Sequence, residues 1–497
     1  MQMKRNSLIL GAIFVMGMFA CKKESPKKDP IESGTTYMSV SITLPQELRA
    51  EEDDKHNPAG TWDGRDKINN MDIYLVANGK VEAKTLDATK QVGSVYQTSP
   101  FSTTGGNKTV YVVVNNGGEV KAKLDAAAAV GADAFDKAYK AAYEVINKGA
   151  HGAVNDTYAN VDANEDVIIM TGAPVEKMII DGVDKDQAAA RNKVSVSVRR
   201  LASRVFVTKD QALENKVEIL ATSGSVQKVL GELKDLKWTV AQYDKKSYLY
   251  SFEGKMNADE VSSPAYAFQP DSRVTYNAQA KNYYDYSLLT DLFEIPVKGA
   301  SLTEAPMLSS MKYITETTHK YAKLPAVSGY VRGNTTYVMV VGTFEPKEEV
   351  FAAGQYEKAK GNGTIYLGTK TGLFYREKDA ATAENQPVPG DPEKDGVIEF
   401  KEGKMFYFAW LNPDELAAAK WNSSPVIRNN IYNINVKSFS KYGFSGNPYN
   451  PDPDDPDKPD PDDPTPDPKD PIYDKETYMT TEITVIKWGL HSYNINF

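Results

Sequence analysis

Cysteine and histidine are scarce in this chain of 497 residues. Cys21 is the only cysteine, which excludes a framework of internal disulfides. The four histidines have no cysteine partner and are far apart in the sequence, so we expect no zinc site among His56, His151, His319 and His491.

Signatures of catalysis and of calcium binding are also missing. The HExxH, GxSxG and P-loop patterns do not occur. Asp162, Asn164 and Asp166 resemble the start of a calcium loop, but Val167 replaces the glycine that such a loop needs, and no glutamate closes it. We therefore expect no cofactor, no metal ion and no enzymatic activity.

The chain also lacks an excess of positive charge. Its 58 Lys and Arg against 67 Asp and Glu give a net charge of −9. Residues 451–471 hold nine Asp and two Lys, which is 2 − 9 = −7, so the remainder carries −9 + 7 = −2. A nearly neutral body offers no basic field for nucleic acid, and we expect no nucleic-acid partner.

The N-terminus is typical of an export signal. Lys4 and Arg5 precede the apolar run Leu8–Phe19, which is too short to span a membrane well. Ala20 then precedes Cys21, and a small residue before a lone cysteine indicates a lipoprotein cleavage site. We predict a signal peptide at 1–20 and a lipid on Cys21, which would hold the precursor at a membrane surface. An ordinary signal peptide with an incidental cysteine is the alternative.

Tyrosine is abundant (29 residues), and Val, Ile and Thr recur in alternating runs, which favours β structure. The length predicts more than one domain, because single cores rarely grow past about 250 residues. We expect a mainly β protein with two β-sandwich domains, at 50–221 and 222–447. Asn78-Gly79 predicts a hairpin turn. A short helical insertion, either one helix or two short ones, is predicted between about 120 and 148, with one apolar face formed by Phe135, Tyr139, Ala142, Tyr143 and Ile146.

A Pro- and Asp-rich segment follows the second domain at 448–472. Proline at every second or third position favours polyproline II, and the like charges keep the chain stretched. It has nothing apolar to bury. We expect an extended, solvated spacer that could span roughly 65 Å.

Two stretches near opposite ends of the chain read almost alike. They are TYMSVSITL at Thr36–Leu44 and TYMTTEITV at Thr477–Val485. Both alternate with period two, which predicts half-buried strands. The apolar positions of the first are Met38, Val40, Ile42 and Leu44. After Lys487 the phase of the second changes, so its apolar positions are Met479, Ile483, Val485, Trp488, Leu490, Tyr493, Ile495 and Phe497.

The repetition suggests that one strand can substitute for the other. The terminal segment, 473–497, has no obvious place on its own body. If the first strand fills a groove and is removed, the terminal strand of another copy could fill that groove by strand addition. Such a contact is head to tail and gives a filament. Removal requires a cut, and we predict it at Arg49-Ala50, which makes 21–49 a propeptide. Alternatively, the resemblance is chance, and Thr36–Leu44 is an ordinary first strand.

Several long motifs resemble the fimbrillin family of Bacteroidales, and within it the main structural subunits of the minor (short) fimbriae. The resemblance covers essentially the whole chain. It is carried by MSVSITLPQELRA, DLKWTVAQYDKKSYL, YITETTH, RGNTTYV, FAWLNP, SPVIRNNIYNINV, SGNP, the Pro/Asp spacer and LHSYNINF.

This resemblance implies two transthyretin-like β-sandwich domains and a C-terminal donor strand. It also implies a lipoprotein precursor at the outer membrane, cut by an Arg-specific protease, and a mature protein in a cell-surface fimbrium. The implied partners are other copies of the chain, accessory tip and anchor subunits, and host surface proteins or other bacteria. The alternative function is a monomeric surface lipoprotein adhesin that binds host protein or glycan.

Overall fold

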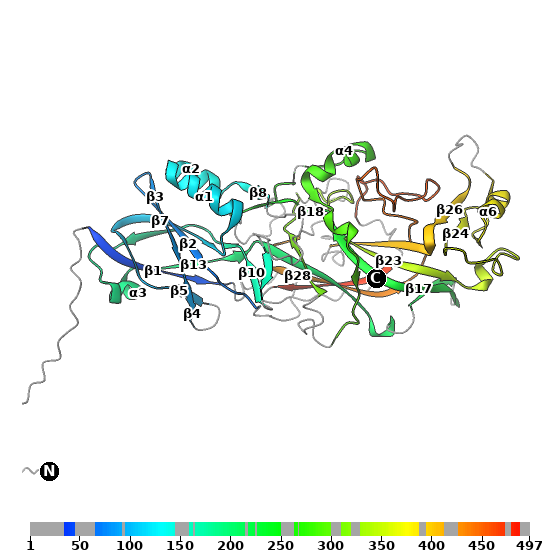
Figure 1. The fold of residues 1–497 in the computed structure, drawn as a ribbon, viewed down its shortest axis with the longest axis horizontal. Helices are drawn as coiled ribbons and strands as arrows, with labels where there is room; N and C mark the ends of the chain where they lie inside the picture. The colour runs from blue at the N-terminus through cyan, green and yellow to red at the C-terminus, as the bar shows by residue number, and fades with distance from the viewer. Residues whose placement is uncertain are drawn as a thin grey trace, which may run out of the picture.

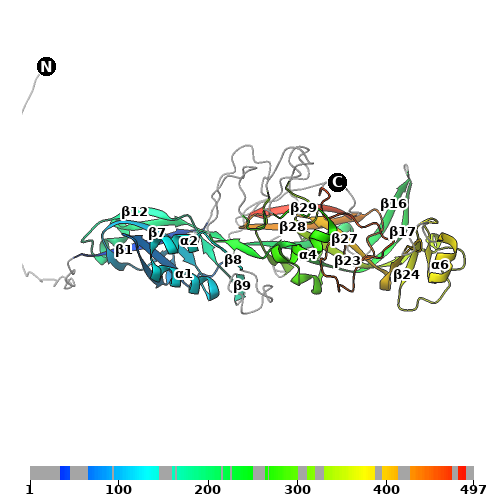
Figure 2. The same ribbon diagram turned by 90° about the horizontal axis from the view of Figure 1, so that it is seen from above.

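The structure, a computed structural model, describes residues 34–44, 65–91, 95–144, 159–162, 165–213, 217–223, 226–249, 263–266, 268–299, 310–319, 329–386, 394–411, 426–472 and 479–487. The fold is mainly β, as the sequence predicts. The molecule is elongated, with one group of strands toward each end (Figure 1 and Figure 2).

Two sheets form the N-terminal group. The first has the order β13-β1-β5-β4, with β6 also paired to β1. Its strands are β1 (Thr35–Thr43), β4 (Ala88–Lys90), β5 (Val95–Thr98), β6 (Phe101–Thr104) and β13 (Lys193–Ser197). The second has the order β14-β11-β7-β2-β3, with β12 on β7. Its strands are β2 (Met71–Ala77), β3 (Lys80–Leu86), β7 (Gly106–Val114), β11 (Met170–Thr171), β12 (Val175–Ile179) and β14 (Arg199–Arg200). Apolar side chains of both sheets share one hydrophobic cluster.

Two helices cover the outer face of the second sheet (Figure 1). They are α1 (Gly118–Val130) and α2 (Ala132–Tyr139), separated by Gly131, whose φ of 140° favours glycine. Phe135 lies with its ring centroid 4.6 Å from that of Tyr74 on β2 and 5.1 Å from that of Tyr111 on β7. The helical insertion is therefore confirmed, although Ala142–Glu144 forms strand β8 and Ile146 lies outside the described residues.

The C-terminal group is built on a nine-stranded sheet of order β22-β15-β28-β16-β17-β23-β27, with β21 on β17 and β29 on β28. The strands are β15 (Ala202–Lys209), β16 (Val217–Ser223), β17 (Val226–Ala241), β21 (Phe293–Glu294), β22 (Lys312–Thr315), β23 (Tyr337–Pro346), β27 (Lys404–Trp410), β28 (Asn430–Phe439) and β29 (Met479–Lys487).

Smaller elements surround these sheets. The other helices include α3 (Ala188–Arg191), α4 (Arg273–Tyr283) and α6 (Lys378–Asn385). The remaining strands are β9 (Ala159–Asp162), β10 (Glu165–Ile168), β18 (Tyr243–Asp244), β19 (Lys246–Tyr248), β20 (Tyr284–Asp285), β24 (Ile365–Gly368), β25 (Phe374–Tyr375) and β26 (Val397–Phe400). Strand β19 pairs with β8, so a short ladder links the two groups.

The chain passes from the first group to the second at Leu201, between β14 and β15. The sequence expectation placed this boundary at 222, about twenty residues later. The reason is that β15 and β16 alternate like the strands before them, yet pair with β28 and β17 of the second sheet. Local periodicity identifies a strand without identifying its partner.

The Pro/Asp segment does not stand away from the body, which corrects the expectation of a stretched, solvated spacer. Its backbone carbonyls accept hydrogen bonds from the body: Pro468 O from Gly333 N at 2.7 Å, and Asp470 O from Arg332 N at 3.0 Å. A Cβ on Gly333 would lie 2.7 Å from Pro468, so this close approach requires glycine. The segment is docked by backbone polar groups and proline rings, which its composition does not reveal.

Candidate functional site

Strand β1 lies in the interior of its sheet, paired along both edges. On one edge it runs parallel to β13, from Ser39 opposite Lys193 to Thr43 opposite Ser197. On the other edge it runs antiparallel to β5 and β6. Removing β1 would leave a slot bordered by β13 on one side and by β5 and β6 on the other, and we call this slot the β1 groove.

The apolar positions predicted for this strand are all buried. Met38, Val40 and Ile42 are 0% exposed, and Leu44 is 5% exposed. The opposite face is buried as well, since Ser39 and Ser41 are 0% and 2% exposed. This differs from the expected half-buried strand, because the short helix α3 and the flanking strands lie against β1. The groove therefore encloses its strand on both faces and both edges.

The N-terminal end of the groove is a polar socket, which we call the Asn192 socket. It is formed by the Ile180 carbonyl, the Val183 backbone and the Asn192 side chain. Thr36 Oγ1 donates to Ile180 O at 2.7 Å and accepts from Val183 N at 2.9 Å. Asn192 Nδ2 donates to Tyr37 O at 2.9 Å and lies 3.3 Å from Thr36 Oγ1. Thr36, Val183 and Asn192 are all fully buried.

The chain between β1 and the body, residues 45–64, lies outside the described residues. The predicted cut at Arg49-Ala50 falls in this segment, and the predicted lipidation site Cys21 precedes the described part of the chain. Their roles therefore stay predictions.

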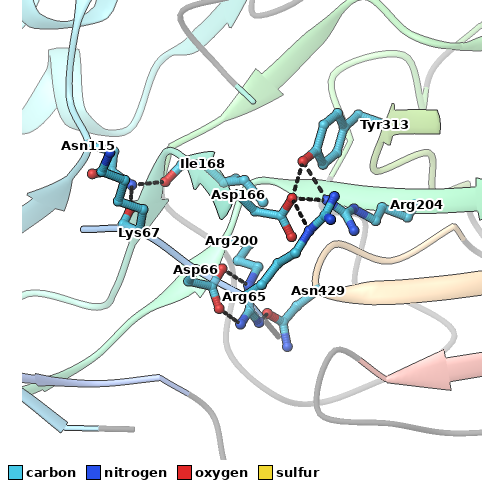
Figure 3. Close-up of polar contacts among 10 residues, drawn as sticks. All are labelled: Arg65, Asp66, Lys67, Asn115, Asp166, Ile168, Arg200, Arg204, Tyr313 and Asn429. Atoms are coloured by element: carbon cyan, nitrogen blue, oxygen red, sulfur yellow. Dashed lines mark hydrogen bonds and ion pairs between the residues drawn. The ribbon is translucent and has the colours of Figure 1, made fainter. Parts of the chain in front are cut away.

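Where the described chain resumes, it is held at the junction of the two strand groups (Figure 3). Asp66 accepts hydrogen bonds from Arg200, whose Nη1 also donates to Asn429 Oδ1 at 2.7 Å. Arg65 Nε lies 3.1 Å from Asp166 Oδ1. Ion pairs of Arg65 and Asp66 thus fix the chain to the body immediately after the segment that contains Arg49.

Asp166 is the centre of a second buried cluster at the same junction. It is 0% exposed, forms an ion pair with Arg204, and accepts a hydrogen bond from Tyr313 at 2.9 Å. Arg204 lies over the Tyr313 ring. Burial, helped by the charge of Asp166, raises the pKa of Tyr313, although the charge of Arg204 acts in the opposite direction. The carboxylate that resembles a calcium ligand in the sequence is therefore held through Oδ1 by arginine and tyrosine, whereas its buried Oδ2 has no hydrogen-bond partner among the described residues.

The C-terminal strand β29 pairs antiparallel with β28 of its own chain, which corrects the expectation that the tail has no place on its own body. The ladder runs from Asn430 opposite Lys487 to Phe439 opposite Met479, with an irregularity between Val436 and Ser438. Met479 is 5% exposed and belongs to the main hydrophobic cluster. Figure 2 shows β28 and β29 side by side.

The positions of the other predicted tail residues are described only in part. Ile483 and Val485 lie opposite Ile434 and Tyr432, whose side chains are buried. Among the described strands, β29 pairs only with β28, so it has one paired edge where β1 has two. The later tail residues lie outside the described part of the chain: Trp488, Leu490, Tyr493, Ile495 and Phe497.

Two other buried ionisable groups, Asp244 and His319, are held by hydrogen bonds to neighbouring groups of the fold. Burial raises the pKa of Asp244 to about 8, although Ser263 and the Ala265 amide donate to its carboxylate. Burial lowers the pKa of His319 to about 4, and its Nε2 lies 2.7 Å from Asn334 O. No group of three or more potential metal ligands occurs in the described ranges. No helix among them is both long and apolar enough to cross a membrane.

Sequence reasoning did not identify Asn192 or the socket. The only signal was the repeated threonine, Thr36 and Thr477, because a buried polar residue that recurs in both copies has a partner to satisfy. The partners themselves come from 144 to 156 residues farther along the chain.

Comparison with known proteins identifies the family. The model of the C-terminal fimbrillin family, "Major fimbrial subunit protein type IV, Fimbrillin, C-terminal", matches residues 398–494. The minor fimbrium subunit Mfa1 of Porphyromonas gingivalis is 38% identical over 520 aligned positions that cover 100% of both chains. Among solved structures, the P. gingivalis W83 fimbrillin FimA matches 91% of this chain and 98% of its own, at 14% identity and TM-score 0.39. The P. gingivalis tip protein Mfa3, truncated at its C-terminus, matches 82% and 98%, at 12% identity and TM-score 0.37. On the full-length identity, the chain belongs to the fimbrillin family and is a fimbrial subunit of the minor-fimbrium type, a component of the cell surface.

Proposed function

We propose that this chain is a shaft subunit of its fimbrium and polymerises by strand exchange. In this proposal it is exported as a lipoprotein through Cys21, cut between Arg49 and Ala50, and joined to the next copy when residues 473–497 fill the vacated β1 groove. The observation that carries the proposal is that β1, which resembles the tail in sequence, is enclosed by its sheet and followed by the segment that contains Arg49.

The two positions open to the tail differ in how many edges they pair. On its own β28 the tail forms one ladder, whereas the β1 groove offers β13 on one edge and β5 and β6 on the other. Backbone groups in the empty groove would lose their partners, and Met38, Val40 and Ile42 would leave apolar surface behind. Exchange therefore replaces a one-edged contact by an enclosed one.

The proposed contact joins two different surfaces of the subunit, and this determines whether the assembly is closed or open. The acceptor groove is in the N-terminal group of strands and the donor strand is at the C-terminus, so the surfaces that meet are different. A heterologous contact of this kind produces an open filament. A shaft subunit needs both a groove and a donor strand, and this chain carries both.

The proposed partners follow from these steps. They are other copies of the chain, an Arg-specific protease, and accessory tip and anchor subunits at the filament ends. Adhesion to host surface proteins or other bacteria is proposed from family membership.

The direct experiment is N-terminal sequencing of the assembled protein. A start at Ala50, reading AEEDD, supports the proposal, whereas a start at Cys21 in assembled filaments overturns the cut and favours a lipoprotein adhesin. The variant Arg49→Ala should accumulate as uncut monomer. Lys55→Ala, a change of a basic residue in the same segment, is the matched control and should be cut and assembled normally.

A deletion of Asp474–Phe497 tests the donor strand separately. This variant should be cut and folded yet remain monomeric in size-exclusion chromatography. Filaments of normal length from the deleted chain would contradict strand exchange while leaving the cut unaffected.

A further inference from the structure

The alternating pattern of the tail does not by itself fix how far the strand slides into a groove. A slip by two residues keeps every side chain on the same face of the sheet, so apolar alternation tolerates it. We propose that the Asn192 socket sets the register, and that the hydroxyl of Thr477 from a second copy of the chain occupies it in the fimbrium. This inference rests on the proposed strand exchange and names the residue that fixes its geometry.

The socket holds a hydroxyl that donates and accepts at the same point, and it requires the acceptor. Thr36 Oγ1 donates to Ile180 O and accepts from Val183 N, at 2.7 and 2.9 Å. The remaining contacts go to the backbone, with Tyr37 N donating to Val183 O at 3.0 Å and Asn192 Nδ2 donating to Tyr37 O at 2.9 Å. Ile180 O also accepts from Asn192 Nδ2 at 2.9 Å, so the group that depends on the incoming side chain is Val183 N. A short hydroxyl side chain accepts from Val183 N and can donate to Ile180 O at the same time.

The tail offers this hydroxyl in one register that also preserves the apolar face. With Thr477 in the socket, Met479, Ile483 and Val485 fall at the positions of Met38, Ile42 and Leu44. In the same register Thr481 takes the place of Val40, the one apolar position that becomes polar.

Slipped registers fail for separate reasons. A slip of two residues brings Lys475 or Met479 to the socket; Lys475 has no acceptor for Val183 N, and Met479 has only a weakly accepting thioether. A slip of four brings Thr481 there, but places Lys487 at the position of Ile42, which is 0% exposed. The sequence of the tail and the chemistry of the socket therefore select the same alignment.

The register of the tail in the groove can be measured at one pair of neighbouring positions, 482 of the tail and 195 of β13. Glu482 would occupy the place of Ser41, whose Oγ lies 3.0 Å from Ser195 Oγ on β13. Ser41 itself is 2% exposed, but Ser195 is exposed and Gln97, opposite Ser41 on β5, is half-buried, so the longer Glu482 side chain can extend past these neighbours to water. The chain that begins at Ala50 contains no native cysteine, so engineered cysteines report the register without background.

The experiment uses cysteine pairs in the chain that begins at Ala50. Ser195→Cys is combined with Glu482→Cys for the selected register, and with Thr480→Cys or Thr484→Cys for the slipped ones. Under mild oxidation, a non-reducing gel should show a ladder of intermolecular multimers for the Glu482 pair and little for the others. Each pair is then repeated with Thr477→Val, Thr477→Ser or Thr481→Val.

We expect Thr477→Val to reduce the Glu482 ladder about tenfold or more relative to the slipped pairs, because the buried Val183 N–H is left without its acceptor. Thr477→Ser keeps the hydroxyl and should behave as the native tail. Thr481→Val makes the same type of substitution where the first strand has Val40, and should leave the register unchanged. All changes at 477 and 481 are in the tail, so the Asn192 socket remains native.

The outcomes separate this inference from the proposed function. An unchanged Glu482 ladder in Thr477→Val would overturn the role of the socket and leave strand exchange standing. Equal cross-linking of all three pairs with the native tail would also overturn it. Absence of every intermolecular cross-link and of filaments with the native tail would refute strand exchange itself.

Discussion

Removal of β1 should selectively destabilise the N-terminal group of strands. The clean perturbation compares a chain of residues 22–473 with one of residues 50–473. Both lack the tail, so no copy can fill the groove of another, and the loss of β29 from β28 affects both equally. The difference between the two chains therefore reports residues 22–49, of which β1 is the described part.

The magnitude follows from burial. Met38, Val40 and Ile42 are each 0% exposed, and full burial of such a side chain contributes about 1.5–3 kcal/mol, or about 5–9 kcal/mol for the three. Domains are stable by about 5–15 kcal/mol in total. One kcal/mol corresponds to about 2–4 °C in the Tm of a domain of 150–250 residues, so the shift should exceed about 10 °C.

Differential scanning calorimetry measures this shift directly. The chain that begins at residue 50 should show one early transition and bind a hydrophobic dye, while the later transition of the other group is unchanged. A peptide of residues 474–497 should restore the early transition, and a peptide of the same composition in scrambled order should not. If the two chains unfold within about 2 °C of one another without added peptide, β1 is not required for the stability of its sheet and the reasoning fails.

Two further perturbations test other parts of the structure. Asp166→Asn leaves buried Arg204 without its counter-charge and should lower the free energy of unfolding by about 3–5 kcal/mol, whereas Glu345→Gln in an exposed pair should cost below about 1 kcal/mol in the same denaturant titration. Burial raises the pKa of Asp463 to about 6, so its protonated form favours the docked Pro/Asp segment, and this contribution is fully present below about pH 4 and lost as pH rises through 6. Hydrogen exchange at the Ser445 amide, which donates to Asp463, should therefore accelerate between pH 5 and 7.5 beyond its intrinsic pH dependence. Asp463→Asn should remove this excess, and an equal excess in the variant would contradict the assignment.

Elements defined by neighbouring residues were predictable from the sequence. Asn78 and Gly79 have φ of 49° and 74°, as the hairpin turn between β2 and β3 requires. Phe135 and Tyr139 lie on the buried face of α2, as their spacing predicts. In each case the signal lies within a few neighbouring residues of the chain, although Tyr74 and Tyr111, the partners of Phe135, are distant in sequence.

Features that depend on distant partners were not predictable. The Pro/Asp segment docks because Arg273 donates to the carbonyls of Pro448 and Pro466, and a carbonyl leaves no trace in composition. Its first part also carries Tyr449, whose ring packs on Trp410 with centroids 5.2 Å apart. A charge count over 451–471 therefore described the solvent-facing groups and missed the bonds that hold the backbone.

The candidate site was predictable in one respect. The repeated strand identified the buried positions of β1, since period two shows which residues share a face. It did not identify Asn192 or β28 as partners, because a strand sequence specifies side-chain alternation and leaves the choice of edge to the rest of the fold. The edge of β28 pairs with the tail of its own chain through backbone hydrogen bonds. The β1 groove of another copy could pair with the tail in the same way.

Because the tail can pair either with β28 or with a β1 groove, assembly requires control over which of these two edges is free. An unpaired strand is prone to join any free edge, and both strands of the repeat are paired in this chain: β1 inside its sheet and β29 on β28. The two pairings are released differently. A ladder on one edge can open and close reversibly, whereas a strand enclosed on both edges and faces, and still joined to its body, returns to its own groove faster than a second copy can enter. Only cutting the connection removes this local advantage. On the proposed mechanism, therefore, raising the concentration of uncut chain to that of assembling mature protein should give no filaments, because the limiting step is vacating the groove and not freeing the tail.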